Sequence, residues 1–121
     1  MFLFRRSEGR VIVDEAHRRT QGADAPAVLL DVRERGEWNA GHAPGAVHTP
    51  LPGLAAGASV PSAALGRPPV VICRNGNRSQ QATKLLAVRG ARAVDVKGGM
   101  NAWAAAGHPV VDERANSGSI G

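Results

Sequence analysis

Two short apolar runs that end abruptly in polar residues constrain the possible folds more than any other feature. Residues 27–32 read AVLLDV, and residues 69–72 read PVVI. Neither run alternates apolar with polar residues, as a strand with one wet face would, so each is predicted to be a strand buried on both faces. Strands of this kind are typical of a parallel sheet covered by helices.

The segments around these runs alternate between helical and extended patterns. Asp14 and Ser79 are expected to cap two of the helices, and Gly90 lies where a helix-ending glycine belongs. The alternation predicts an α/β fold with a mostly parallel central sheet, and right-handed crossovers would place helices on both of its faces. Further strands are expected at residues 46–48 and 93–96, and helices at about 14–20, 33–39, 79–89 and 99–106.

The length of the chain accommodates one domain of ordinary size. Its 121 residues fall in the range of about 100–150 that single domains usually occupy. We expect a single domain over residues 1–121, with a core at about 10–111 and a polar, flexible tail over 113–121. The segment from Pro50 to Pro69 is rich in Pro, Gly, Ala and Ser, and a loop with one short helix is expected there.

The composition argues against nucleic acid and membranes as partners. Aromatic residues make up 3% of the chain and tyrosine is absent, so a stacking platform for single-stranded nucleic acid is nearly excluded. The formal net charge is +5, but the basic residues are scattered, with no run longer than a pair. No stretch approaches the roughly 18 apolar residues of a membrane span. Neither kind of partner is therefore expected.

Cys73 is the only cysteine of the chain. An intramolecular disulfide, a zinc site of several cysteines and a dithiol redox mechanism within the chain are therefore excluded. A single cysteine fits a reducing compartment, and the first residues form too short an apolar run for a secretory signal. We expect a soluble cytoplasmic protein, with no metal and no cofactor.

Cys73 stands where ligands are expected to bind in such a fold. In an open parallel sheet, ligands bind at the carboxyl ends of the strands, and Cys73 directly follows the 69–72 strand. A short loop leads from there to Arg78 and the next helix. Gly76 permits a positive φ in this loop, so that successive backbone N–H groups can point inward and form an anion-binding nest. The helix dipole and the flanking Arg74 and Arg78 add positive charge.

These surroundings favour the thiolate form of Cys73 over the thiol. The hypothesis is a reactive thiolate inside an anion cradle. The alternative is a structural cysteine at a strand end, since cysteine is often buried. The hypothesis fails if the sulfur is sealed off from solvent and the neighbouring amides are turned away from it.

Three blocks of the sequence resemble a known family. The first lies within residues 31–46 and contains DVRE, EW and GHAPGA; the second, at 73–79, reads CRNGNRS; the third, within 98–110, contains GGMNAW and AGHPV. In their order and spacing these blocks span about residues 10–111. The chain resembles a single-domain rhodanese, a sulfurtransferase.

The resemblance implies a sheet between layers of helices, with Cys73 as nucleophile. In that family the thiolate attacks the outer sulfur of an anionic donor such as thiosulfate, sulfite leaves, and the cysteine holds a persulfide. Cyanide or a thiol, including one on a protein, then takes the sulfur, and no cofactor takes part. The implied active-site loop, whose arginines are the expected contacts for the donor, consists of Arg74, Asn75, Gly76, Asn77 and Arg78.

Two other functions remain open. A cysteine-based phosphatase or arsenate reductase of the Cys-x5-Arg type uses the same kind of thiolate cradle. Its arginine would fall at the position of Ser79, whereas Arg78 comes one residue early. The other function is a non-catalytic module that binds a partner protein. Modules that lose catalysis typically replace the cysteine, and Cys73 is present.

Several other polar and aromatic residues receive structural interpretations. Asp31 and Arg33 follow a predicted strand and are expected to form a local turn or ion pair. Trp38 and Trp103 are expected to lie in the core. The four histidines are expected to make polar contacts rather than to bind a metal.

Overall fold

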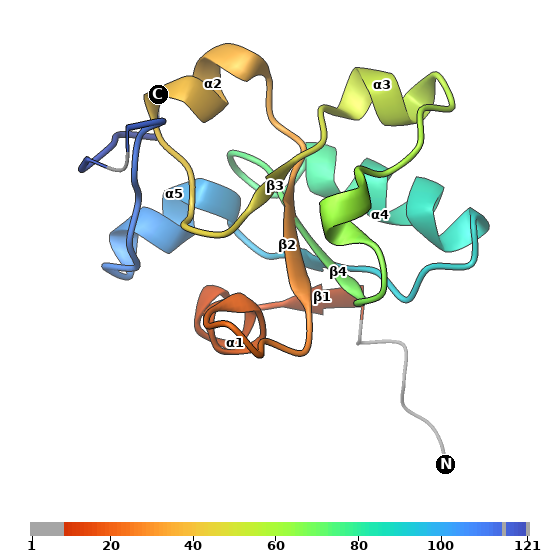
Figure 1. The fold of residues 1–121 in the computed structure, drawn as a ribbon, viewed down its shortest axis with the longest axis horizontal. Coiled ribbons are helices and arrows are strands. Elements are labelled where there is room, and N and C mark those ends of the chain that lie inside the picture. The colour runs from red at the N-terminus through yellow and green to blue at the C-terminus, as the bar shows by residue number, and fades with distance from the viewer. Residues whose placement is uncertain (1–8, 115, 121) are drawn as a thin grey trace.

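The computed structural model describes residues 9–114 and 116–120 (Figure 1). Residues 1–8, 115 and 121, which belong to the expected domain and tail, lie outside the described residues. The strands are β1 (Arg10–Val11), β2 (Val28–Asp31), β3 (Val47–His48), β4 (Pro69–Ile72) and β5 (Val94–Val96). They form one sheet in the order β1-β5-β4-β2-β3, and every pair is parallel. The predicted parallel sheet is confirmed.

Helices cover both faces of this sheet, as the α/β prediction requires. They are α1 (Val13–Thr20), α2 (Arg35–Ala40), α3 (Leu51–Ala55), α4 (Arg78–Val88), α5 (Gly99–Ala105) and the 3₁₀ turn η2 (Ser62–Ala64). In Figure 1, α1 and α5 lie on one side of the sheet and α3 and α4 on the other. α2 follows the carboxyl end of β2 and lies at the upper edge of that view.

The sheet divides the apolar core into two layers. In β2, Leu29 belongs to the layer that contains Trp103 of α5, whereas Leu30 belongs to the layer that contains Leu86 of α4. All residues of β2 and of β4 are buried. This two-sided burial explains why both strands lack alternating polar residues, and Asp31, the last residue of β2, is the only charged residue in either strand.

A buried ion pair follows β2. Arg33 Nη2 lies 2.8 Å from Asp31 Oδ2, and both side chains have an exposed fraction of 0%. Arg33 also donates to the backbone carbonyl oxygens of Gly41, at 2.6 Å, and Ile120, at 3.4 Å. The expected local ion pair is therefore present, and it also joins the turn after α2 and the C-terminal segment to the edge of the sheet.

Residues 116–120 pack against the domain, which differs from the free tail expected over 113–121. Ser119 N–H donates to the carbonyl oxygen of Ala40 at 3.0 Å. A Cβ at Gly41 would lie 2.0 Å from the carbonyl oxygen of Ser119, so the missing side chain allows the two backbones to meet. The contact joins segments far apart in the chain, and the polar composition of the tail gives no sign of it.

Two predicted helix caps are wrong. α1 begins after Ile12, so Asp14 lies in its first turn, and the Asp14 carboxylate instead bonds to the ring of His108 at 2.7 Å. α4 begins one residue earlier than expected, so Ser79 lies inside the helix and its hydroxyl donates to a carboxylate on β5. Both side chains have partners distant in sequence, which local capping rules do not consider.

The segment between Pro50 and Pro69 forms two short helical pieces, α3 and η2, where a single one was expected. Pro50 and Pro61 directly precede them, each with a φ of −55°. Because proline fixes φ near the helical value and has no N–H to satisfy, both residues favour the start of a helix.

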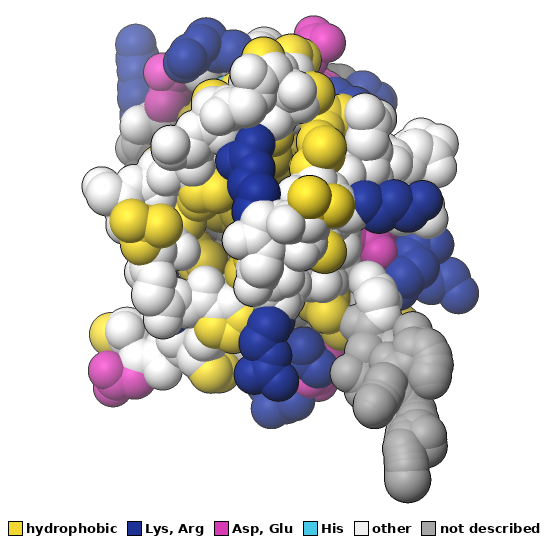
Figure 2. Space-filling view, turned by 90° about the vertical axis from the view of Figure 1, so that its right-hand side faces the viewer, with side chains coloured by type: hydrophobic (Ala, Val, Ile, Leu, Met, Phe, Trp, Pro, Cys, Tyr) yellow, Lys and Arg dark blue, Asp and Glu magenta, His cyan; other side chains and the backbone are white. Residues whose placement is uncertain are grey.

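The basic side chains are dispersed over at least one large face. Figure 2 shows the side of the molecule that carries α3, η2 and α4, where Lys and Arg side chains occur at several separate places among apolar and uncharged ones and lie next to one another at the lower edge. In the part of the chain that the structure covers, no helix is long and apolar enough to cross a membrane.

Candidate active site

Cys73 lies at the carboxyl end of β4, the central strand of the sheet. The chain turns there through residues 74–77 and enters α4 at Arg78. Because the strands are parallel, the carboxyl ends of the neighbouring strands β5 and β2 lie at the same edge. The structure therefore has Cys73 at the edge of the sheet where ligands bind in parallel α/β folds.

Two backbone amides point at the sulfur of Cys73. The N–H groups of Gly76 and Ser79 each donate to Cys73 Sγ at 3.2 Å. Gly76 has a φ of +97°, and a Cβ there would lie 2.9 Å from Arg10 Nη2 and 3.1 Å from the backbone nitrogen of Gly98. A residue with a side chain would be strained at this position for both reasons. The inward-facing amides match the anion nest expected from the sequence.

The sulfur is nevertheless covered. Cys73 has an exposed fraction of 0%, and its side chain packs in the core layer that contains Val71 and Ala82. Of the two conditions that together would reject the thiolate hypothesis, the structure meets burial, but the amides face the sulfur rather than turning away. In this structure the sulfur is therefore not accessible to solvent.

The loop is held from below by the start of α5. Met100 N–H donates to the carbonyl oxygen of Cys73 at 2.8 Å, and Asn101 N–H donates to that of Arg74 at 2.9 Å. Gly99 has a φ of +58°, and a Cβ there would lie 2.3 Å from the Cys73 carbonyl oxygen. The sequence predicts only a turn at these glycines, and the structure shows that the turn also permits this close approach.

The two arginines of the loop have different surroundings. Arg78 forms a double ion pair with Glu37 of α2, at 2.8 Å from Nη1 to Oε1 and 3.0 Å from Nη2 to Oε2. The hydrogen bonds from Arg78 are the main cause that lowers the pKa of Glu37 to about 2. Arg74 is exposed and makes no side-chain hydrogen bond to any residue within the described ranges. Only Arg74 is thus available to a ligand without breaking an ion pair.

The two loop asparagines lie on the outer surface. Asn75 and Asn77 are both exposed, and Asn75 Oδ1 accepts the N–H of Asn77 at 3.1 Å. The structure therefore divides the expected site residues into a buried floor, made by Cys73 and Gly76, and an exposed outer side that includes Arg74.

Three residues that were not among the expected site residues form a hydrogen-bonded network next to the sulfur: Ser79, Asp95 and Arg10. Ser79 Oγ lies 3.4 Å from Cys73 Sγ and donates to Asp95 Oδ2 at 3.1 Å. Arg10 of β1 donates to both oxygens of Asp95 and to the carbonyl oxygen of Gly76, each at 3.1 Å. The sequence held one signal of this network, because Asp95 is a carboxylate in the middle of a strand that is otherwise valine.

The two tryptophans differ. Trp103 is in the core, with an exposed fraction of 0%, as expected. Trp38 is only half-buried and stacks on the rings of His42 and His48, with centroid distances of 3.6 Å and 4.8 Å. The expectation of a core residue is therefore wrong for Trp38. Within residues 9–114 and 116–120, no group of three or more His, Cys, Asp or Glu side chains could hold a metal ion.

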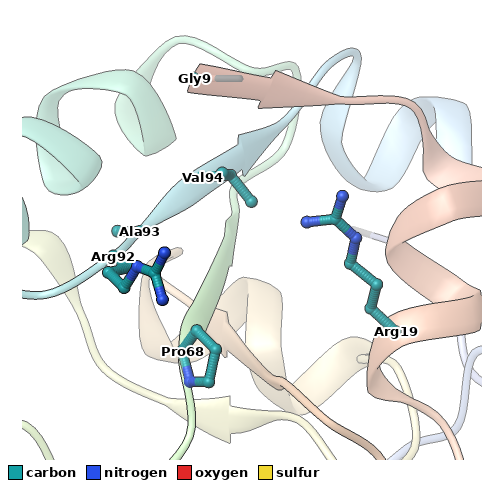
Figure 3. Close-up of a pocket in the computed structure, with 6 residues that line it drawn as sticks. All are labelled: Gly9, Arg19, Pro68, Arg92, Ala93 and Val94. Carbon is teal, nitrogen blue, oxygen red and sulfur yellow. The ribbon is translucent and has the colours of Figure 1, made fainter. Parts of the chain in front are cut away.

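A separate hollow lies away from Cys73, beside the amino ends of β4 and β5. It has a volume of about 420 Å³, and Figure 3 shows the guanidinium groups of Arg19 and Arg92 on two sides of it. Gly9, Pro68, Ala93 and Val94 complete its lining. None of these residues belongs to the loop around the sulfur, so this hollow is not part of the candidate site.

Comparison with known proteins identifies a family match over most of the chain. The model of the Rhodanese-like domain matches residues 13–106. A curated relative, an adenylyltransferase and sulfurtransferase of Yarrowia lipolytica, is 34% identical over 103 residues. The match covers 81% of this chain but 26% of the relative, so the chain spans about a quarter of that protein's length.

Solved structures agree with this match. A crystal structure of a rhodanese-related protein from Thermoplasma volcanium superposes with a TM-score of 0.64 at 33% identity, covering 73% of this chain and 86% of that one. The solution structure of a rhodanese-like domain from Anabaena sp. gives a TM-score of 0.72 at 30% identity, covering 93% and 87%.

Proposed function

Because the chain belongs to the rhodanese-like domain family, we propose that it is a sulfurtransferase that carries sulfane sulfur as a persulfide on Cys73. The donor is a small anion, with thiosulfate as the preferred candidate, and the acceptor is cyanide or a thiol. The observation that carries the proposal is the convergence of two amide N–H groups on the sulfur of the only cysteine.

The first half-reaction needs a negatively charged sulfur. The Cys73 thiolate attacks the outer sulfur of thiosulfate, a new S–S bond forms, and the bond between the two thiosulfate sulfurs breaks. Sulfite leaves with the electron pair of that bond. The N–H groups of Gly76 and Ser79 are fixed donors that can stabilise the thiolate before the attack and the terminal persulfide sulfur after it.

The arginines contribute in different ways. Arg74 is exposed and carries no competing ion pair, so it is the proposed contact for the anionic donor. Arg78 is held by Glu37 at the start of α4, so it contributes its charge and the position of the loop rather than a free hydrogen-bonding side chain. Asn75 and Asn77 line the outer side of the loop and are proposed as further polar contacts.

In this proposal, movement of residues 75–77 opens access to the sulfur. Cys73 is fully covered, whereas Arg74, Asn75 and Asn77 are exposed. The carbonyl groups of Cys73 and Arg74 are tied to α5, so the displacement falls on the residues that follow. Loops commonly supply this kind of motion at binding sites.

The second half-reaction takes its acceptor from outside. The outer sulfur of the persulfide passes to cyanide or to a thiolate, and Cys73 leaves as the thiolate. Because the chain has a single cysteine, no second thiol of this chain can take that sulfur. A small thiol or a cysteine of another protein has the required chemistry.

Mass spectrometry tests the proposal directly. After incubation with thiosulfate, the protein is expected to gain the mass of one sulfur atom, and subsequent cyanide should remove it and yield thiocyanate. The Cys73→Ser variant, which differs by one atom, should show neither change. If thiosulfate, 3-mercaptopyruvate and polysulfide all fail to load the wild-type protein, the sulfurtransferase proposal is rejected.

A non-catalytic binding module is the second candidate, and the complete burial of Cys73 is the observation in its favour. Absence of sulfur loading would support it. A cysteine-based phosphatase has less support, because the residue that would be its arginine is Ser79, whose hydroxyl is engaged with Asp95. Turnover of p-nitrophenyl phosphate without sulfur transfer would instead favour the phosphatase over the sulfurtransferase.

A further inference from the structure

A buried carboxylate lies close to the sulfur that has to carry a negative charge. Asp95 has an exposed fraction of 2%, and only the hydroxyl of Ser79 separates it from Cys73. A buried like charge at this range repels the negative charge that the sulfur carries in the proposed reaction. The neighbourhood of Cys73 therefore contains a group that works against the thiolate unless it is neutralised.

Arg10 supplies the neutralising charge. Its guanidinium contacts both oxygens of Asp95, in the paired geometry that guanidinium and carboxylate groups favour. Arg10 comes from β1 at the edge of the sheet and is 40% exposed, so its own charge remains partly hydrated while the carboxylate is buried. The pair as a whole presents little net charge to the sulfur.

The same side chain also holds the loop. Arg10 Nη2 donates to the carbonyl oxygen of Gly76, which also accepts from Gln80 Nε2 at 2.8 Å. Gly76 supplies one of the two N–H groups at the sulfur. Anchoring its carbonyl therefore restricts rotation of the residue whose amide faces Cys73.

Other charged groups around Cys73 do not duplicate this role. Arg78 of α4 is engaged by Glu37 of α2, and Arg74 points to the exposed side of the loop. The contacts from α5 to the loop are hydrogen bonds from the backbone amides of Met100 and Asn101, which carry no net charge. Arg10 is the cation in direct contact with Asp95 among the described residues.

We propose that Arg10 is a positioning residue for the reaction of Cys73, because it neutralises Asp95 beneath the sulfur and holds Gly76 in the orientation that aims its N–H at that sulfur. The inference deepens the proposed sulfurtransferase function and rests on it. Arg10 touches neither donor nor acceptor in this scheme, and its effect reaches the sulfur through Ser79 and Gly76.

The experiment measures the rate at which iodoacetamide alkylates Cys73, as a function of pH, in the full chain. Arg10→Gln is expected to move the pH profile of the alkylation rate to higher pH. A shift of about one pH unit would lower the rate at neutral pH about tenfold. Arg18→Gln is the matched control. Arg18 is a surface arginine paired with Glu15, and its replacement should leave the profile unchanged.

A double variant separates charge balance from structural support. Adding Asp95→Asn to Arg10→Gln removes the carboxylate that Arg10 neutralised, and the alkylation rate should return to within about threefold of wild type. A merely structural role for Arg10 predicts that the double variant reacts no faster than the single one. Thermal melting identifies a variant that has lost the fold.

The outcomes are distinguishable from failure of the proposed function, since alkylation needs no sulfur donor. If Asp95→Asn restores the alkylation rate of the Arg10→Gln protein but the wild-type protein forms no persulfide, the sulfurtransferase proposal is rejected and the role of Arg10 is retained. A folded Arg10→Gln protein with the wild-type profile, or a double variant without rescue, would overturn the inference. So would a wild-type thiol that is alkylated only after unfolding.

Discussion

Gly76 has a φ of +97° and supplies one of the two N–H groups at Cys73 Sγ, so the hydrogen bonding of the sulfur depends on the backbone conformation of this residue. We predict that Gly76→Ala slows persulfide formation about tenfold or more, equivalent to a rise of roughly 1.4 kcal/mol in the barrier. A Cβ there meets Arg10 Nη2 and the backbone of Gly98, so the loop has to shift. Quenched-flow mass spectrometry after mixing with thiosulfate measures the rate.

Gly45→Ala is the control for this variant. Gly45 also has a positive φ, +77°, but a Cβ there would meet nothing within 4 Å. Both substitutions should lower the free energy of unfolding by about 1–2 kcal/mol, because both force a side chain into the left-handed region. Only Gly76→Ala should slow sulfur loading. Equal rates in the two variants would show that the Gly76 amide does not contribute.

At the scale of elements, the ion pair between Glu37 and Arg78 joins α2 to the start of α4. Arg78 lowers the pKa of Glu37 from its ordinary value of 4.5 to about 2. A carboxylate whose pKa is lowered by folding stabilises the folded state above the ordinary value, and this stabilisation is lost as pH falls through the lowered value. The pair should therefore lose its contribution between about pH 4.5 and pH 2.

Urea unfolding at several pH values checks this contribution. Glu37→Gln should lower the free energy of unfolding by roughly 0.5–1 kcal/mol at neutral pH, because the pair is partly exposed. The difference between variant and wild type should shrink as pH falls below 4.5 and be nearly gone near 2. A difference that stays constant with pH would mean that Glu37 acts through packing or through the hydrogen bond that its carboxylate accepts from the Glu34 N–H, not through charge.

At the scale of the whole molecule, the C-terminal segment closes over α2 and the edge of the sheet. Gly41→Ala should lower the free energy of unfolding by roughly 1–3 kcal/mol, since overpacking of a close contact costs this much. Its Cβ would fall on the carbonyl oxygen of Ser119 and displace residues 116–120. The displacement also removes an acceptor of the buried Arg33.

Gly36→Ala serves as the comparison. Gly36 lies in α2, the helix that Gly41 directly follows, and a Cβ there would meet nothing within 4 Å, so the change should raise stability by about 0.5–1 kcal/mol through helix propensity. Chemical denaturation measures both. Limited proteolysis adds a local readout, because cleavage within 116–120 should accelerate in Gly41→Ala alone. Equal cleavage in both variants would indicate that this segment does not depend on the contact.

The sequence by itself determined the architecture and the place of Cys73, the proposed nucleophile. The apolar runs of β2 and β4, which do not alternate with polar residues, required strands buried on both faces, and Cys73 directly after β4 put the sulfur at the carboxyl edge of the sheet. Gly76 indicated the inward turn of the loop. These features are encoded locally, since burial patterns and backbone preferences act over a few neighbouring residues.

Only the tertiary structure decided which groups surround that sulfur. Ser79 looked like a cap from its neighbours, but Asp95 on another strand takes its hydroxyl. Arg10, 66 residues before Gly76, anchors the loop, and no local pattern marks it for this role. Burial of Cys73 likewise results from packing of separate elements. Contacts between distant segments arise from how helices and strands stack, so they follow from the assembled fold and not from any short stretch of sequence.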